Sequence, residues 1–357
     1  MSTTPVSNES LHDRRIEETL PLVSPEELLA EYPLSAELAE RVIRSRREVT
    51  AVLDREDPRL LVVVGPCSVH DPVAALDYAR RLEALSRELP DLLVVMRVYF
   101  EKPRTTTGWK GLINDPHLDD SGDVNAGLRT ARRLLLEVLE IGLPIGCEYL
   151  DPITPQYIAD TVAWGAIGAR TTESQTHRQL ASGLSMPIGF KNRTDGNVGV
   201  AVDALRAAGA RHSFAGVELG GGSAILRTAG NADCHIILRG GRGTTNFDAD
   251  SVADTIERLR AIGLPERVII DASHDNSGKV PARQIVAAGE IGEQIAAGNE
   301  AIVGIMLESF IVEGSQSSDG DGELTYGQSI TDACIAWEDT VTVLDGLATA
   351  VRERRGR

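Results

Sequence analysis

Eight short apolar segments of the chain each end in a side chain that can do chemistry. The segments span residues 60–68, 92–100, 144–150, 165–170, 187–192, 234–240, 267–274 and 301–309. In the same order, the reactive residues at or near their ends are Cys67, Arg97, Glu148, Arg170, Lys191, Arg239, His274 and Glu308. Any one of them would merely mark where a strand leaves the core. Because parallel strands present their carboxyl ends on one face, eight in succession predict a single functional site.

Cationic side chains form the larger chemical group among these residues. They are Arg97, Lys102, Arg104, Arg170, Lys191 and Arg239. Guanidinium and ammonium groups bind phosphate and carboxylate, and unpaired cations packed together would repel one another. We therefore expect a small substrate, or two, carrying several phosphate and carboxylate charges.

A second group combines one sulfur, one imidazole and two carboxylates. Its members are Cys67, His274, Glu308 and, further along the chain, Asp332. Such mixed ligands suit manganese, iron, cobalt or zinc, and an open coordination position would let the metal polarise a carbonyl. The four residues are widely spaced, and simple packing is the alternative interpretation for a lone cysteine or histidine. The position of Cys67, His274 and Glu308 at strand ends favours a metal site.

The elements that must position these residues alternate between apolar strands and amphipathic helices. This order is typical of a parallel sheet covered by helices, and eight strands predict an α/β protein with a (β/α)8 TIM barrel. An open doubly wound sheet is the alternative. Residues 15–56 predict two helices, so we assign 1–56 to an N-terminal helical extension and 57–357 to the catalytic barrel. Two alternating runs around a Gly-Gly-Gly turn, within about 212–228, predict an inserted β-hairpin before strand 6.

Composition limits the partners and the location of the protein. The formal net charge of -17 over 357 residues argues against nucleic acid, because duplex binding depends on cationic contacts with phosphate. No apolar run approaches the roughly 20 residues that span a bilayer, so no membrane contact is expected. The first residues contain no apolar signal segment, and we expect a cytoplasmic protein. The four cysteines show no CxxC spacing, which argues against a disulfide framework.

Long blocks of the sequence resemble the type I 3-deoxy-D-arabino-heptulosonate 7-phosphate (DAHP) synthases that aromatic amino acids regulate. The blocks include GPCSVHD, MRVYFEKPRTTTGWKGLINDP, WGAIGARTTESQTHR, GFKNRTDG, GNADCHIILRGG and SITDACIAWEDT. The resemblance implies a transferase that condenses phosphoenolpyruvate with D-erythrose 4-phosphate, giving DAHP and phosphate in the first step of the shikimate pathway. A related enzyme that uses arabinose 5-phosphate and a non-catalytic paralogue are the alternatives.

The resemblance also implies roles for individual residues. The implied metal ligands are Cys67, His274, Glu308 and Asp332, with Mn²⁺ as the expected ion and Fe²⁺, Co²⁺ or Zn²⁺ as alternatives. The implied substrate-binding residues are Arg97, Lys102, Pro103, Arg104, Thr105, Glu148, Ala169, Arg170, Lys191 and Arg239. Acid–base roles are expected for Lys102, Glu148 and His274.

Regulation is implied as well. In this family the hairpin and the N-terminal extension shape an inhibitor cavity and the subunit contacts, so a homodimer or homotetramer is expected. The matching effector positions are Asp151, Pro155, Gln156, Leu180, Leu184, Ser185 and Phe214. Phenylalanine and tyrosine are both candidate inhibitors.

Overall fold

The computed structural model of the chain describes residues 12–104, 107–318 and 323–357. Its centre is a closed barrel of eight parallel strands. In chain order these are β1 (Leu60–Gly65), β2 (Leu92–Arg97), β3 (Ile145–Glu148), β4 (Trp164–Ile167), β5 (Ile188–Lys191), β8 (His235–Leu238), β9 (Val268–Asp271) and β10 (Ile302–Glu308). The first and last strands pair, with Gly65 opposite Glu308, and this pairing closes the barrel. The predicted (β/α)8 barrel is confirmed, and the open sheet is wrong for this chain.

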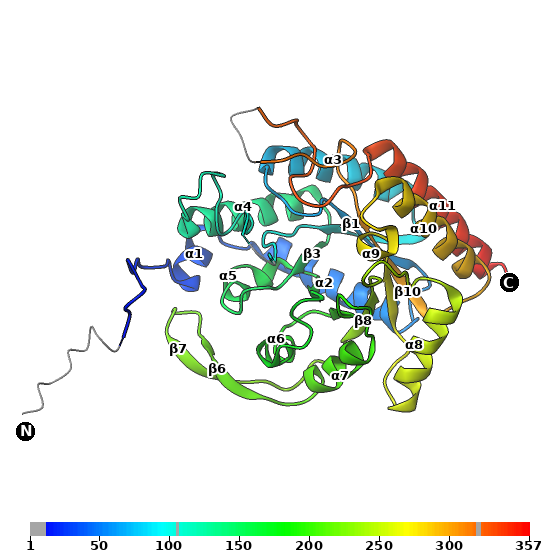
Figure 1. Cartoon of the computed structure of the whole chain (residues 1–357), viewed down its shortest axis with the longest axis horizontal. Coiled ribbons are helices and arrows are strands. Elements are labelled where there is room, and N and C mark those ends of the chain that lie inside the picture. Colours follow the sequence, from blue (N-terminus) through cyan, green and yellow to red (C-terminus); the bar gives the residue numbers. More distant parts are fainter. Residues whose placement is uncertain (1–11, 105–106, 319–322) are drawn as a thin grey trace, which may run out of the picture.

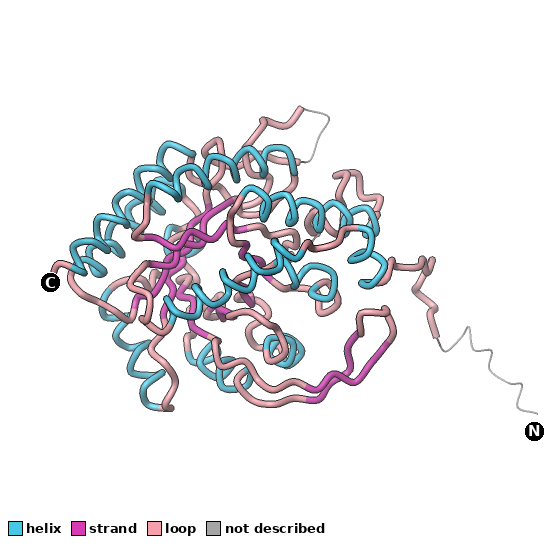
Figure 2. The backbone as a smooth tube through the Cα atoms, turned by 180° about the vertical axis from the view of Figure 1, so that it is seen from behind, coloured by secondary structure: helices cyan, strands magenta, loops and turns pink. Residues whose placement is uncertain are grey.

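Helices surround the barrel and return the chain from each strand to the next (Figures 1 and 2). They are α3 (Pro72–Glu88), α4 (Val124–Ile141), α5 (Pro155–Ile158) with the short η2 (Ala159–Thr161), α6 (Gln175–Ala181), α7 (Gly199–Ala208), α8 (Ala249–Ala261), α10 (Pro281–Ala296) and α11 (Trp337–Arg355). A single-turn helix, α9 (His274–Ser277), follows β9 directly. The start of α3 illustrates the local signals: Asp71 accepts hydrogen bonds from the N–H groups of Val73 and Ala74, and Pro72 opens the helix.

Two helices precede the first strand, α1 (Pro25–Glu31) and α2 (Ala36–Leu53). The second closes one end of the barrel, because its buried Val49 and Leu53 pack with inward-facing residues of the strands such as Val63. Arg46 of α2 donates to the carbonyl of Val162, just before β4 begins, which identifies this as the amino-terminal end. The opposite end is the mouth of the barrel. The division of the chain at residues 56 and 57 remains a prediction.

The predicted hairpin forms strands β6 (Ser213–Val217) and β7 (Ser223–Arg227), which pair antiparallel with Ala215 opposite Ile225. Figure 2 shows it as a ribbon separate from the central barrel. Its turn lies beside α1, where the N–H of Glu26 donates to the carbonyl of Leu219. A hairpin one strand pair wide cannot bury both faces, so one face is free to line a cavity.

Within the described parts of the chain, none of the helices has the length and apolarity that a bilayer crossing requires. The cytoplasmic location expected from the sequence remains a prediction.

Candidate active site

The reactive strand ends meet at the mouth of the barrel, as the parallel topology requires. Four of them, Arg97, Glu148, Lys191 and Glu308, are the last residues of their strands. A cavity of about 50 Å³ lies there. Predicted residues that line this cavity are Cys67, Arg97, Lys102, Pro103, Glu148, Ala169, Arg170, Lys191, Arg239, His274 and Asp332.

Two predicted residues lie beside this cavity rather than on its wall, and a third is not described. Glu308 lies behind the wall, with a side chain that is 1% exposed. Arg104 is exposed, and its Nε donates to the carbonyl of Trp109 at 2.7 Å. Thr105 lies outside the described residues.

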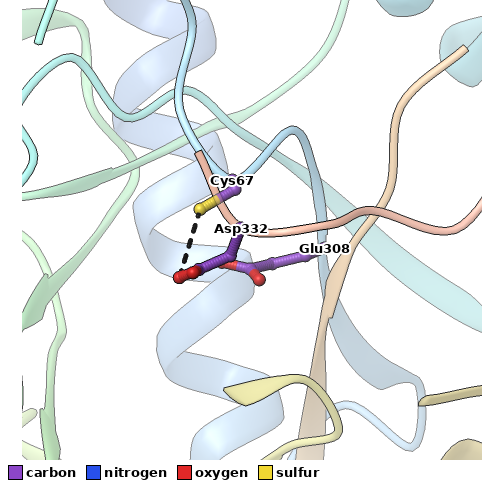
Figure 3. A group of neighbouring side chains, drawn as sticks. All are labelled: Cys67, Glu308 and Asp332. Carbon is purple, nitrogen blue, oxygen red and sulfur yellow. Dashed lines mark hydrogen bonds between the residues drawn. The ribbon is translucent and has the colours of Figure 1, made fainter. Parts of the chain in front are cut away.

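Three of the predicted metal ligands converge (Figure 3). Cys67, Glu308 and Asp332 each offer a donor atom, and these atoms all lie within 4.8 Å of one another. The fourth, His274, points toward the same group, with its Nε2 3.6 Å from Oε1 of Glu308. Cys67 lies in the loop after β1, and Glu308 ends β10. Asp332 lies in the loop before α11, and His274 is the first residue of α9. One sulfur, two carboxylates and one imidazole fit a borderline divalent metal.

A buried carboxylate contacts the imidazole of His274 on the side away from the metal donors. Its Nδ1 lies 2.8 Å from Oδ2 of Asp271, a side chain with no exposure to solvent. An acceptor at Nδ1 places the proton there and leaves the lone pair on Nε2, as metal-binding histidines require. His274 also has a φ of 50°, an unusual backbone conformation for a residue with a side chain. The site is therefore organised for ligation at Nε2.

Lys102 lies among the metal donors. Its Nζ is 2.8 Å from Sγ of Cys67 and 3.0 Å from Oδ2 of Asp332. Burial lowers the pKa of the Lys102 ammonium, but Cys67 and Asp332 outweigh this effect and raise it. Burial and the carboxylate of Glu308 raise the pKa of the Cys67 thiol, although Lys102 opposes them. The ammonium thus neutralises part of a donor set that would otherwise repel itself.

Three other cations of the mouth are already paired with carboxylates of the chain. Nη2 of Arg97 lies 3.1 Å from Oε1 of Glu308, and both side chains are 1% exposed. Nζ of Lys191 lies 2.9 Å from Oδ2 of Asp271.

The third pair is between Arg239 and Asp275. Arg170 differs from these cations: it is exposed and has no hydrogen-bond or ion-pair partner among the residues that the structure describes. It is the cation most available to an incoming anion.

Glu148 lies close to the backbone of the loop after β4. A Cβ at position 168 would be only 2.4 Å from Oε1 of Glu148, so this carboxylate packs directly against Gly168. The neighbouring Ala169 and Arg170 line the same cavity. The carboxylate of Glu148 and the guanidinium-bearing Arg170 therefore share one cavity.

Several residues of the site were missed by the sequence reasoning. They are Tyr99, Glu101, Gly168, Thr194 and Lys279, which line the cavity, and Asp271 and Asp275 behind it. Lys279 binds Oδ1 of Asp332 at 2.9 Å. Burial and the nearby Asp151 raise the pKa of Glu101 to about 7. Only Asp271 had a usable signal, since it ends the apolar run of β9 three residues before His274.

A second cavity, of about 540 Å³, lies between the hairpin and α5 and α6. Predicted effector residues that line it are Pro155, Gln156, Leu180, Leu184, Ser185 and Phe214. Asp151 does not line it; its Oδ1 accepts instead from the N–H of Ile153 at 2.7 Å. The cavity is mainly apolar but includes the charged Arg46, Asp160 and Arg227.

Comparison with known proteins identifies the class of enzyme that this barrel and mouth define. Residues 36–345 match the DAHP synthetase I family. The chain belongs to this family, and the family, the enzyme class and the DAHP synthase function predicted from the sequence are confirmed.

Individual relatives agree with the family assignment. The chain is 56% identical to the Phe-sensitive phospho-2-dehydro-3-deoxyheptonate aldolase of Escherichia coli K12, an alignment that covers 96% of this chain and 98% of that protein. It is 54% identical to the corresponding aldolase of Corynebacterium glutamicum, with 99% of both chains covered. The solved structure of that aldolase from Francisella tularensis SCHU S4 superposes with a TM-score of 0.94 at 49% identity, covering 96% of this chain and all of the other.

Proposed function

We propose that the mouth of the barrel condenses phosphoenolpyruvate with D-erythrose 4-phosphate through the residues described above. The observation that carries this proposal is the convergence of six cationic side chains with four metal donors around one cavity. Phosphate and carboxylate groups are the anions that such cations bind best. The arabinose 5-phosphate alternative is not favoured, because the family match extends along most of the chain.

Phosphoenolpyruvate is held by Arg97, Lys191, Arg239, Arg170 and Ala169 in this proposal. Arg97, Lys191 and Arg239 are each fixed by a carboxylate of the chain, so their positions are set before substrate arrives. Such preorganisation lowers the barrier because charges need not rearrange during the reaction. Arg170, which has no partner among the described residues, makes the first contact.

Erythrose 4-phosphate is held by the loop that contains Lys102, Pro103, Arg104 and Thr105. The N–H of Lys102 donates to the carbonyl of Lys110 at 2.8 Å, which closes this loop at its base. Among the residues that the structure describes, the exposed guanidinium of Arg104 is anchored through Nε alone, so its other donors can reach a sugar phosphate.

Cys67, His274, Glu308 and Asp332 hold the divalent metal, and Mn²⁺ is the ion we propose. The metal would supply Lewis acidity toward the aldehyde oxygen of the sugar phosphate. Asp271 keeps the His274 proton on Nδ1, so Nε2 is free for this ligation. The donor chemistry does not distinguish Mn²⁺ from Fe²⁺, Co²⁺ or Zn²⁺.

Carbon 3 of phosphoenolpyruvate attacks the aldehyde carbon, a water adds at carbon 2, and the tetrahedral intermediate expels phosphate. Lys102 stays protonated beside the sulfur of Cys67 and the carboxylate of Asp332, and it gives a proton to the new hydroxyl group. Glu148 lies next to Ala169 and Arg170 and takes a proton from the attacking water. Cationic groups position the enol ether and offset the repulsion between the two phosphates.

The test is a steady-state assay with purified protein. Turnover with erythrose 4-phosphate, but not with arabinose 5-phosphate, is expected; it should disappear on chelation and return with Mn²⁺. Lys102→Met should bind metal normally and lose at least 100-fold in kcat, the usual contribution of a positioned proton donor. Full activity of this variant would refute the role of Lys102.

We also propose that the second cavity binds phenylalanine or tyrosine as a feedback inhibitor. Its apolar wall and its charged side chains of both signs, Arg46, Arg227 and Asp160, suit an aromatic amino acid zwitterion. Two of the similar proteins, both from E. coli K12, are named Phe-sensitive and Tyr-sensitive. Inhibition assays with each aromatic amino acid would separate the candidates.

A homodimer or homotetramer is the assembly we propose. Large apolar side chains stay exposed on the N-terminal arm and on the hairpin, with Leu20 at 71% and Ile225 at 76% exposure. Exposed apolar groups of this size mark protein contacts when they lie close together. Light scattering of the purified protein would measure the mass of the assembly.

A further inference from the structure

Asp275 lies at the mouth of the barrel and forms one ion pair there, with Arg239. Its carboxylate pairs with Nη1 of Arg239 through a short contact. It has no second side-chain hydrogen bond or ion pair within the described residues. The other carboxylates paired with mouth cations have further contacts: Glu308 and Asp332 are donors of the metal cluster, and Asp271 holds His274.

The backbone fixes Asp275 opposite Arg239. Nδ2 of the next residue, Asn276, donates to the carbonyl of Leu238 at 3.2 Å and to that of Asp271 at 2.8 Å, which ties α9 to the ends of β8 and β9. Gly240 has a φ of 70°, and a Cβ there would lie 2.8 Å from the backbone nitrogen of Asn276. These contacts hold the loops after β8 and β9 against each other, and they place Asp275 within reach of Arg239.

Solvent reaches the two partners differently. The Arg239 side chain is 7% exposed and the Asp275 side chain is 24% exposed. Nε of Arg239 is buried and has no hydrogen-bond partner in the described part of the chain, so this guanidinium has donor capacity that Asp275 does not use. The more exposed carboxylate of Asp275 can therefore move into solvent, whereas the buried guanidinium of Arg239 stays in place.

We propose that Asp275 is an internal counter-anion that occupies Arg239 in the free enzyme and that the phosphate of the substrate displaces. This inference rests on the proposed assignment of Arg239 to phosphoenolpyruvate. The carboxylate is a positioning residue: it holds the guanidinium of Arg239 in place until a phosphate arrives. After the reaction, Asp275 pairs with Arg239 again, and this ion pair favours release of the product phosphate.

Competition of this kind has a measurable consequence for anion affinity. Any phosphate that binds Arg239 must first give up the interaction between Arg239 and Asp275, so Asp275 weakens binding of substrate and product alike. Removing the negative charge should therefore tighten both. For a charge-assisted hydrogen bond in a partly exposed pair, the expected effect is about tenfold in a dissociation constant.

The experiment compares wild type with Asp275→Asn, which keeps the shape and removes the charge. Calorimetric titration of the Mn²⁺-loaded enzymes with phosphoenolpyruvate and with inorganic phosphate should show about tenfold tighter binding of both to the variant. KM for phosphoenolpyruvate and the inhibition constant of phosphate should fall together, while KM for erythrose 4-phosphate should change less than twofold. Metal content is measured for each protein, because residue 275 follows His274.

Two further variants separate the proposal from general effects of charge. Asp275→Glu keeps a carboxylate near Arg239 and should restore weak, wild-type-like phosphate binding. Glu173→Gln removes a carboxylate that pairs with Arg193 at 2.7 Å outside the mouth cavity, and should leave both affinities unchanged.

Unchanged or weaker binding of both anions by Asp275→Asn, with normal metal content, would overturn the proposal. Equal tightening by Glu173→Gln would overturn it too, because net charge alone would then explain the effect. A wild-type enzyme that binds phosphoenolpyruvate but forms no DAHP would refute the proposed chemistry, while the binding comparison would still decide the role of Asp275.

Discussion

Asp271 connects the proposed substrate site with the proposed metal site, so its replacement should damage both. Its carboxylate is fully buried and lies 2.9 Å from Nζ of Lys191 and 2.8 Å from Nδ1 of His274. His274 and Lys191 hold the pKa of Asp271 well below its usual range although burial raises it. Asp271→Asn preserves the volume but removes the charge that both neighbours need.

The expected magnitude follows from burial. Lys191 is 4% exposed, so the substitution leaves an almost fully buried ammonium without its counter-charge. Breaking a buried ion pair in this way costs about 3–5 kcal/mol in the free energy of unfolding. Loss of the carboxylate behind a metal-binding histidine lowers metal affinity by about 10–100-fold.

Urea unfolding measures the first effect and calorimetric titration with Mn²⁺ measures the second. Asp271→Asn combined with Lys191→Met should recover part of the stability, because the unpaired charge is gone, but none of the metal affinity. Asp254→Asn is the matched control: it removes an exposed partner of Arg258 and should change stability by less than about 1 kcal/mol. Wild-type stability and Mn²⁺ affinity in Asp271→Asn would refute the reasoning.

Three other predictions test separate parts of the molecule. Cys67→Ser should fold normally but lose metal affinity and turnover, because the sulfur is the softest donor; full Mn²⁺ binding would contradict the ligand assignment. Ser185→Trp should fill the second cavity and abolish inhibition by phenylalanine or tyrosine at unchanged kcat, and inhibition equal to wild type would exclude this cavity as the effector site. Burial lowers the pKa of His235 from 6.5 to about 3, and Trp164 donates to its Nε2 at 3.0 Å. The unfolded chain therefore binds the extra proton between these pH values, so the free energy of unfolding should fall by up to about 1.4 kcal/mol per pH unit as the pH drops below 6.5. In His235→Gln, urea unfolding at pH 7, 6 and 5 should show a shallower slope, and an unchanged slope would rule out His235 as its source.

The barrel could be predicted because its signals are local. Apolar runs of strand length, such as Leu60–Gly65, alternate with helices whose starts are marked by residues such as Asp71. Parallel strands of a barrel share one carboxyl face, so reactive residues at their ends must converge whatever the packing details. The hairpin was equally readable from its alternation around three glycines.

The ion-pair partners of the site residues could not be predicted from local sequence signals. Lys102 and Asp332 are 230 positions apart, and Lys191 and Asp271 are 80 positions apart. Pairing across such distances depends on the strand order of the closed barrel, which brings β5, β8 and β9 side by side. Sequence spacing contains no measure of that geometry.

The sequence by itself determined which chemical groups this protein has and which face of the barrel they share, because strand periodicity and parallel topology act locally. Only the tertiary structure decided which carboxylate holds which cation: Asp271 behind His274, Asp275 against Arg239, and Lys102 among the metal donors. The reason is that ion pairing depends on distances of a few ångströms between loops, and those distances exist only after the barrel has closed.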